Sequence, residues 1–173
     1  DEYCMYRSIG LEIIQPISDD GHSISSSRIR ELIQDGFVRR ANFELGSVFG
    51  FMAVVIHGVG RGKELNFPTA NVIPVEKNQL MPKPGVYFTR GRIIGLQAYG
   101  MCNFGTRPTF DEHELVLEIH FFHDELDNLY GKEIRVEFLE RIRDEKKFPS
   151  PEELKSQLQK DKLRCLELQG KYE

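Results

Sequence analysis

Residues 58–71 read Gly58-Val59-Gly60-Arg61-Gly62-Lys63-Glu64-Leu65-Asn66-Phe67-Pro68-Thr69-Ala70-Asn71, a glycine-dense, basic turn that follows an apolar segment. Glycine lets backbone N–H groups approach an anion without a Cβ in the way. Arg61 and Lys63 add positive charge to the turn. The run therefore predicts a phosphate-binding loop formed by Gly58, Gly60, Arg61, Gly62 and Lys63. Taken alone, the same pattern also fits an ordinary hairpin loop.

The end of the run adds two candidate metal ligands. Thr69 and Asn71 are two residues apart, so in an extended segment both side chains leave the same face. A hydroxyl and an amide oxygen are hard, neutral ligands, which suit a magnesium ion that arrives with nucleotide phosphates and waters. The run as a whole predicts a phosphate-and-magnesium site.

Two common nucleotide-binding motifs are excluded by the same residues. A Walker loop needs Ser or Thr after its G-K pair, but Glu64 follows Lys63, and His57 stands where the first glycine belongs. The dinucleotide fingerprint fails because Lys63 occupies its last glycine position. The predicted phosphate site therefore lies outside these two folds.

Composition describes one or two small globular units. The chain has 173 residues, of which 40% are hydrophobic and 29% charged, and the net charge is -4. The acidic balance argues against a general nucleic-acid binder, and neither a signal peptide nor a bilayer-length apolar stretch is apparent. Cys4, Cys102 and Cys165 lie far apart, which predicts reduced thiols and a cytoplasmic protein.

The first segment, residues 1–45, reads differently from the remainder. Residues 11–14 predict a short strand, and Ser25 or Ser26 predicts the cap of a helix that ends at Gly36. A second helix is predicted over 39–45. Because one strand and two short helices cannot bury a core, we interpret this segment as the tail of a domain that begins elsewhere.

The following segment predicts a β structure that ends in a helix. Short strands separated by turn-forming residues favour an antiparallel barrel. The predicted strands cover 51–56, 85–89, 93–101, 115–122 and 133–139, and residues 103–110 are predicted as a turn-rich loop. Ser150, Pro151 and Glu153 predict the start of a C-terminal helix. Its apolar face, which should pack on the barrel, carries Leu154, Leu158, Cys165 and Leu168.

Glu118 is a candidate general base. Alternation along the strand places Leu117 and Ile119 on the core face, and Glu118 on the other face with His120 and other apolar residues. Apolar surroundings disfavour the charged carboxylate and raise its proton affinity. A solvent-exposed glutamate is the alternative that this strand leaves open. We expect His120 to be a hydrogen-bonded sheet residue without a chemical role.

Residues 46–173 resemble the riboflavin kinases. The run at 58–71, with its Phe67-Pro68-Thr69-Ala70-Asn71 core, looks like the signature of that family. The combination of motifs in the family's order is highly specific. The other matching pieces are Gly85-Val86-Tyr87, Asn103-Phe104-Gly105-Thr106-Arg107-Pro108-Thr109-Phe110, Glu118-Ile119-His120, Asp127-Asn128-Leu129-Tyr130-Gly131 and residues 143–148.

Two positions depart from the family's usual pattern. Asn66 stands where glycine is common, and asparagine tolerates a left-handed backbone better than most residues. Lys63 stands where arginine is frequent, which keeps the charge but loses forked hydrogen bonding.

A second resemblance concerns the first segment. Residues 24–30, Ile24-Ser25-Ser26-Ser27-Arg28-Ile29-Arg30, are similar to the serine-rich helix start of nucleotidyltransferases. The pairing resembles the bacterial bifunctional riboflavin kinase/FMN adenylyltransferases. It implies a remnant of an adenylyltransferase domain at 1–45 and a kinase domain at 46–173. Because no H-x-G-H motif is present, we expect the chain to lack adenylyl transfer, with the rest of that domain upstream in the parent protein.

The resemblance implies transfer of the ATP γ-phosphate to the ribityl 5'-hydroxyl of riboflavin, giving FMN and ADP. Thr69 and Asn71 match the magnesium ligands, and Glu118 matches the catalytic base. The loop from Gly58 to Lys63 would cover the phosphates. Pro68, Asn103 and Arg143 are the remaining expected contacts to nucleotide or flavin. The family fold is a six-stranded antiparallel barrel with a C-terminal helix.

Two other function classes stay open at this point. One is a barrel that binds flavin without catalysis. The other is an oligonucleotide-binding barrel, which the acidic balance and the absence of tryptophan disfavour, although phenylalanine and tyrosine could stack on bases.

Overall fold

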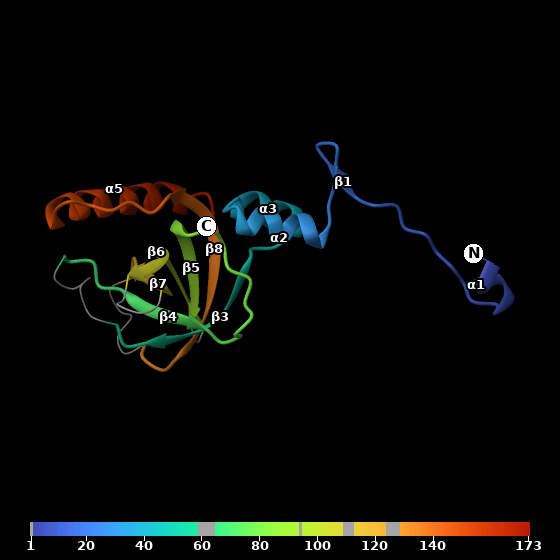
Figure 1. Cartoon of the computed structure of the whole chain (residues 1–173), viewed down its shortest axis with the longest axis horizontal. Coiled ribbons are helices and arrows are strands. Elements are labelled where there is room, and N and C mark those ends of the chain that lie inside the picture. The colour runs from blue at the N-terminus through green and yellow to red at the C-terminus, as the bar shows by residue number, and fades with distance from the viewer. Residues whose placement is uncertain (1, 59–64, 94, 109–112, 124–128) are drawn as a thin grey trace.

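A computed structural model describes residues 2–58, 65–93, 95–108, 113–123 and 129–173. Short elements come first, a run of strands follows, and one long helix ends the chain (Figure 1). The elements are α1 (Glu2–Tyr6), β1 (Ser18–Asp19), β2 (His22–Ser23), α2 (Ser26–Gln34), α3 (Val38–Leu45), β3 (Gly50–Ile56), β4 (Ala70–Pro74), β5 (Gly85–Ile93), β6 (Leu96–Pro108), β7 (His113–Phe121), β8 (Glu133–Arg143) and α5 (Pro151–Gln169).

Strands β3 to β8 close into a barrel in the order β3-β4-β7-β6-β5-β8. Every neighbouring pair is antiparallel, including the closing pair of β3 with β8. Closure leaves none of these six strands as an unpaired edge. The predicted six-stranded antiparallel barrel is confirmed.

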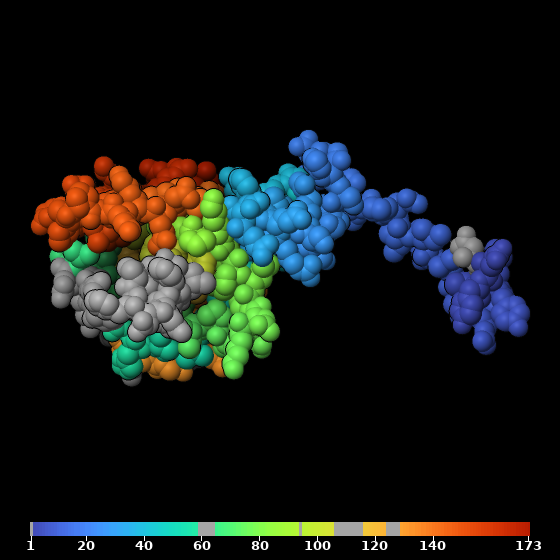
Figure 2. Space-filling model, viewed as in Figure 1, coloured from blue at the N-terminus to red at the C-terminus, as the bar shows by residue number. Residues whose placement is uncertain are grey.

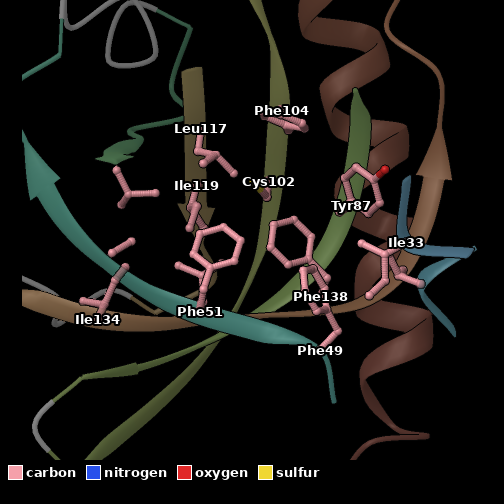
Figure 3. Packing of buried hydrophobic residues seen from close by; sticks show 14 of the residues in the cluster. Ile33, Phe49, Phe51, Tyr87, Cys102, Phe104, Leu117, Ile119, Ile134 and Phe138 are labelled. Carbon is pink, nitrogen blue, oxygen red and sulfur yellow. The ribbon is translucent and has the colours of Figure 1, made fainter. Parts of the chain in front are cut away.

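Alternate side chains of the strands fill the barrel interior. Phe51, Leu117, Ile119 and Phe138 are at most 4% exposed and belong to one apolar cluster (Figure 3). The rings of Phe51 and Phe138 lie 5.6 Å apart between centroids. In a six-stranded barrel the interior is narrow enough for side chains to fill. The rest of the site must therefore lie on the outer face or at the rim.

Helix α5 covers part of the outer face, as Figure 1 shows. Ser150 caps it by accepting a hydrogen bond from the Glu153 amide, as predicted. Cys165 and Leu168 are buried in a second apolar cluster, which lies between the helix and the barrel. The strand residues in that cluster include Val86, Phe88, Met101 and Leu139.

An ion pair joins α5 to β8. Both nitrogens of Arg143 that face the helix donate to Asp161, with Nη2 at 2.7 Å from Oδ2. Gln157 adds a hydrogen bond of 2.8 Å to the same carboxylate. The Asp161 side chain is 3% exposed, so its charge depends on these partners.

Helices α2 and α3 pack against the barrel, as Figure 2 shows. Ser25 caps α2, as expected. Ile33, Val38 and Ala41 join the interior cluster. The Asn42 amide ties α3 to the sheet, because it accepts from the Phe49 amide and donates to the Phe138 carbonyl. The second half of the first segment is thus part of the barrel's core.

The predicted strand at 11–14 is wrong. Leu11, Ile13 and Ile14 are exposed, and the segment extends away from the barrel (Figure 1). A strand is held by hydrogen bonds to a neighbour, and in the described part of the chain no strand pairs with these residues.

Two predictions about β6 are also wrong. The predicted strand 93–101 combines the end of β5 with the start of β6, because the chain reverses at Gly95, whose φ is +80°. Residues 103–108, predicted as loop, extend β6. Their pairing with β7 overrides the local preference of Asn, Gly and Pro for turns.

Asp161→Ala should destabilise the fold by about 3 kcal/mol, because it leaves the Arg143 guanidinium without its carboxylate partner in a largely buried place. Urea unfolding of the full chain measures the change. Glu167→Ala is the matched control, since it breaks the exposed pair with Arg164 on the same helix and should cost less than about 1 kcal/mol. Equal losses would contradict a structural role for the Arg143–Asp161 pair.

Candidate functional site

Three predicted site residues face one another across adjacent strands. Asn71 on β4 lies opposite Glu118 on β7, and Glu118 lies opposite Asn103 on β6. Directly opposed residues point to the same side of a sheet, with Cβ atoms about 5 Å apart. Their neighbours Leu117 and Ile119 fill the interior, so the three polar side chains leave the outer face. This row confirms the predicted faces of the Glu118 strand.

Arg143 lies at the same level but farther along the row. Asn103 is opposite Val86 on β5, and Val86 is opposite Arg143 on β8. Val86 is buried beneath α5, and the guanidinium of Arg143 is turned toward Asp161. The structure thus brings Asn71, Glu118 and Asn103 together directly and places Arg143 at the helix-covered end.

Asn71 is held at a close approach of the chain. It is 6% exposed, although it faces away from the barrel interior. A Cβ built at Gly58 would overlap the Asn71 side-chain amide, so only a glycine leaves room for it. Gly58 therefore shapes the pocket of a predicted ligand, a role that differs from simple backbone flexibility.

The turn before β4 is fixed at successive residues. Asn66 adopts a left-handed backbone with φ +62°, as its tolerance for that geometry predicted. Phe67 is buried in the cluster under α5. Pro68 is exposed, but its carbonyl oxygen accepts a hydrogen bond from His120. Thr69, half-buried, then leads into β4.

The pair at 69 and 71 fits a magnesium ion chemically. It offers a hydroxyl and a buried amide oxygen, both hard oxygen ligands. Two neutral ligands leave the remaining coordination positions to phosphate oxygens and water. Glu118, half-buried and opposite Asn71, is placed to accept a proton from a group bound beside that pair.

Four residues of the predicted phosphate loop, Gly60, Arg61, Gly62 and Lys63, lie outside the described residues. Their proposed contact with phosphates stays a prediction. Only Gly58, at the start of the loop, is placed.

Sequence reasoning missed two residues that shape the site. One is His120, whose ring bonds to the main chain before Thr69. The other is Glu145, whose carboxylate lies against the Cα of Gly105, so that a Cβ there would overlap it. Neither contact has a local signal, because each joins residues at least 40 positions apart.

Comparison with known families gives one consistent match. The family model described as riboflavin kinase (flavokinase) matches residues 45–168. Of the curated proteins named bifunctional riboflavin kinase/FMN adenylyltransferase, that of Bacillus subtilis (strain 168) is 37% identical over 160 residues, covering 91% of this chain and 50% of its own length. That of Escherichia coli (strain K12) is 36% identical over 176 residues, covering 98% and 55%.

A solved structure has the same architecture. It is the crystal structure of a protein named as a macrolide-efflux protein from Streptococcus pneumoniae, and its TM-score to this chain is 0.85 at 35% sequence identity. The match covers 93% of this chain and 52% of that one. This chain spans about half the length of the curated relatives it matches.

Gly58→Ala should destabilise the protein by about 1–3 kcal/mol, because the new methyl group displaces the buried Asn71 amide. Urea unfolding gives the free energy, and the side-chain amide resonances of Asn71 report its displacement. Gly170→Ala serves as control: its φ is −60° and no heavy atom lies within 4 Å of an added Cβ. Unmoved Asn71 resonances in Gly58→Ala would contradict the close approach.

Proposed function

This chain belongs to the riboflavin kinase family, and we propose that it transfers the γ-phosphoryl group of ATP to the ribityl 5'-hydroxyl of riboflavin. The products are FMN and ADP. The chain carries the kinase part of proteins that are about twice its length. The observation that supports the residue assignment is the register that sets Asn71 opposite Glu118.

The chemistry needs a base beside the transferred group. The ribityl oxygen attacks the γ-phosphorus, and the bond from that phosphorus to the β,γ-bridging oxygen breaks, so that ADP leaves. Glu118 accepts the proton of the attacking hydroxyl and orients it, which is typically worth about a hundredfold to ten-thousandfold in rate. Asn71, directly opposite, holds the phosphate end of the nucleotide at the same level of the barrel.

Thr69 and Asn71 are the proposed magnesium ligands. When bound, the ion neutralises phosphate charge, a main requirement of phosphoryl transfer. Thr69 contributes its hydroxyl from the turn, and Asn71 its amide oxygen from β4. The glycine loop that begins at Gly58 covers the phosphates with backbone N–H groups.

Riboflavin binds on the other side of Glu118 in this proposal. Asn103, exposed and opposite Glu118, contacts the flavin or its ribityl chain. Arg143 lines the end of that surface under α5, where the pair with Asp161 fixes the direction of its guanidinium. The flavin ring then lies between the barrel rim and the helix.

Residues 1–45 are the proposed end of an adenylyltransferase domain, and 46–173 the kinase domain. The serine-rich start of α2, capped by Ser25, supports this division. The rest of the adenylyltransferase domain would precede this chain in the parent protein, so the chain itself should not form FAD. The efflux for which the Streptococcus pneumoniae protein is named is not proposed for this chain, because the family model and the curated relatives agree on a kinase.

A cytoplasmic location is part of the proposal. The three cysteines are free thiols, and two of them, Cys102 and Cys165, are buried. Free thiols are typical of a reducing compartment. Within the described ranges, no helix combines the length and apolarity needed to cross a membrane.

Mass analysis of the product from riboflavin, ATP and magnesium tests the function. A mass gain of one phosphate, together with ADP, is the expected result. Quenching of riboflavin fluorescence without ADP formation would indicate a flavin-binding barrel instead. An added AMP would contradict the assignment of the first segment.

Glu118→Gln should lower kcat by about a hundredfold or more, because the amide keeps the shape of the side chain but cannot accept the hydroxyl proton. Riboflavin binding, followed by fluorescence quenching, should remain near that of the parent chain. Glu133→Gln, at the exposed start of β8, is the matched control and should keep full turnover. Near-normal turnover in Glu118→Gln would remove this residue from the mechanism.

A further inference from the structure

We propose that His120 is a positioning residue, whose hydrogen bond to the Pro68 carbonyl holds the main chain at Thr69 and so sets the two proposed magnesium ligands. The inference rests on the function proposed above for Thr69 and Asn71. It concerns a residue for which the sequence predicted no chemical role.

The hydrogen bond fixes which ring nitrogen carries the proton. Nδ1 of His120 lies 2.8 Å from the Pro68 carbonyl oxygen. A carbonyl oxygen only accepts, so Nδ1 is the donor. Nε2 faces the ammonium of Lys162 at 3.5 Å and is therefore the unprotonated nitrogen of a neutral ring. Burial lowers the pKa of His120, and the nearby Lys162 charge acts in the same direction, in keeping with this neutral form.

His120 links the two strands at the point where their backbone pairing ends. The pairing of β4 with β7 runs from Val72–Leu117 to Ala70–Ile119. Two residues before Ala70 stands Pro68, which has no N–H to donate to a neighbouring strand. The imidazole supplies a bond across this gap, from a β7 side chain to the chain that precedes β4.

The ring itself is held by packing. His120 is 6% exposed, and its centroid lies 5.1 Å from that of Phe67 and 5.7 Å from that of Phe122. Phe67 immediately precedes Pro68, so one side chain packs on the ring and the next carbonyl bonds to it. A ring with so little freedom transmits the position of β7 to the turn.

Helix α5 provides the remaining contact. The Lys162 ammonium lies over the Phe122 ring at 5.5 Å and beside His120 Nε2. The preceding residue, Asp161, is the partner of Arg143. Adjacent residues of one helix therefore contact both the ring that fixes the metal turn and the arginine proposed to face the flavin.

Loss of the donor should affect the nucleotide more than the flavin. The Pro68 carbonyl would lose its protein partner, and the turn at Thr69 would relax. Catalytic and metal-binding groups tolerate little displacement. Glu118, two residues away on the same strand, keeps its own position through pairing on both sides.

The test compares two substitutions in the full chain. His120→Phe keeps an aromatic ring against Phe67 but lacks the donor, whereas His120→Asn keeps an N–H close to the place of Nδ1. Magnesium-dependent ADP binding is measured by calorimetry, riboflavin binding by fluorescence, and turnover with varied magnesium-ATP. His22→Phe, at an exposed position on β2, is the matched control.

His120→Phe should weaken magnesium-ADP binding and raise the KM for magnesium-ATP by about tenfold or more, the effect of one lost hydrogen bond to a buried group. Riboflavin affinity should stay within about twofold. His120→Asn should recover most of the nucleotide affinity, and His22→Phe should change nothing.

Equal nucleotide affinity in His120→Phe and the parent chain would overturn the proposal, and so would a parallel loss of nucleotide and riboflavin binding. If His120→Phe does not fold, His120→Gln replaces it, because its amide reaches toward the Nε2 position and should behave like the loss of the donor. If the parent chain itself binds ADP equally with and without magnesium, the proposed ligand role of Thr69 and Asn71 fails first, and the positioning role fails with it.

Discussion

The register of β7 between β4 and β6 is the constraint on which the rest of this molecule depends. It puts Leu117 and Ile119 inside the barrel and places Glu118 outside, between Asn71 and Asn103. A slip of one residue would exchange the two faces, burying the carboxylate and exposing the core residues. Core packing and site geometry are therefore fixed together, since the energy that holds Leu117 and Ile119 inside also aims Glu118.

Helix α5 belongs to the site as well as to the fold. Its apolar face closes the second cluster, in which Phe67 and Val86 are buried. Its polar residues at 161 and 162 reach Arg143 and His120. The outer face of a small barrel offers no enclosed cavity of its own, and a helix laid across it creates a boundary. In this protein the same helix residues stabilise the boundary and orient groups beside it.

Much of the fold was predictable from local signals. The capping pattern at Ser150, the helix start at Ser25 and the alternation around Glu118 each depend on residues a few positions apart, and all three are confirmed. The strand predicted at 11–14 and the loop predicted at 103–108 were wrong for one shared reason. Whether an extended segment becomes a strand depends on a partner, and β7 supplies one for residues 103–108.

The sequence by itself determined the types of group the chain brings to its chemistry, namely a glycine turn, two neutral oxygen ligands and a carboxylate, together with the family. Only the tertiary structure decided which of them meet. It set Asn71 against Gly58 and opposite Glu118, turned Arg143 to Asp161, and gave His120 the Pro68 carbonyl. These contacts join residues from 13 to 52 positions apart. No local propensity records such pairs, because they arise from the closure and register of the barrel.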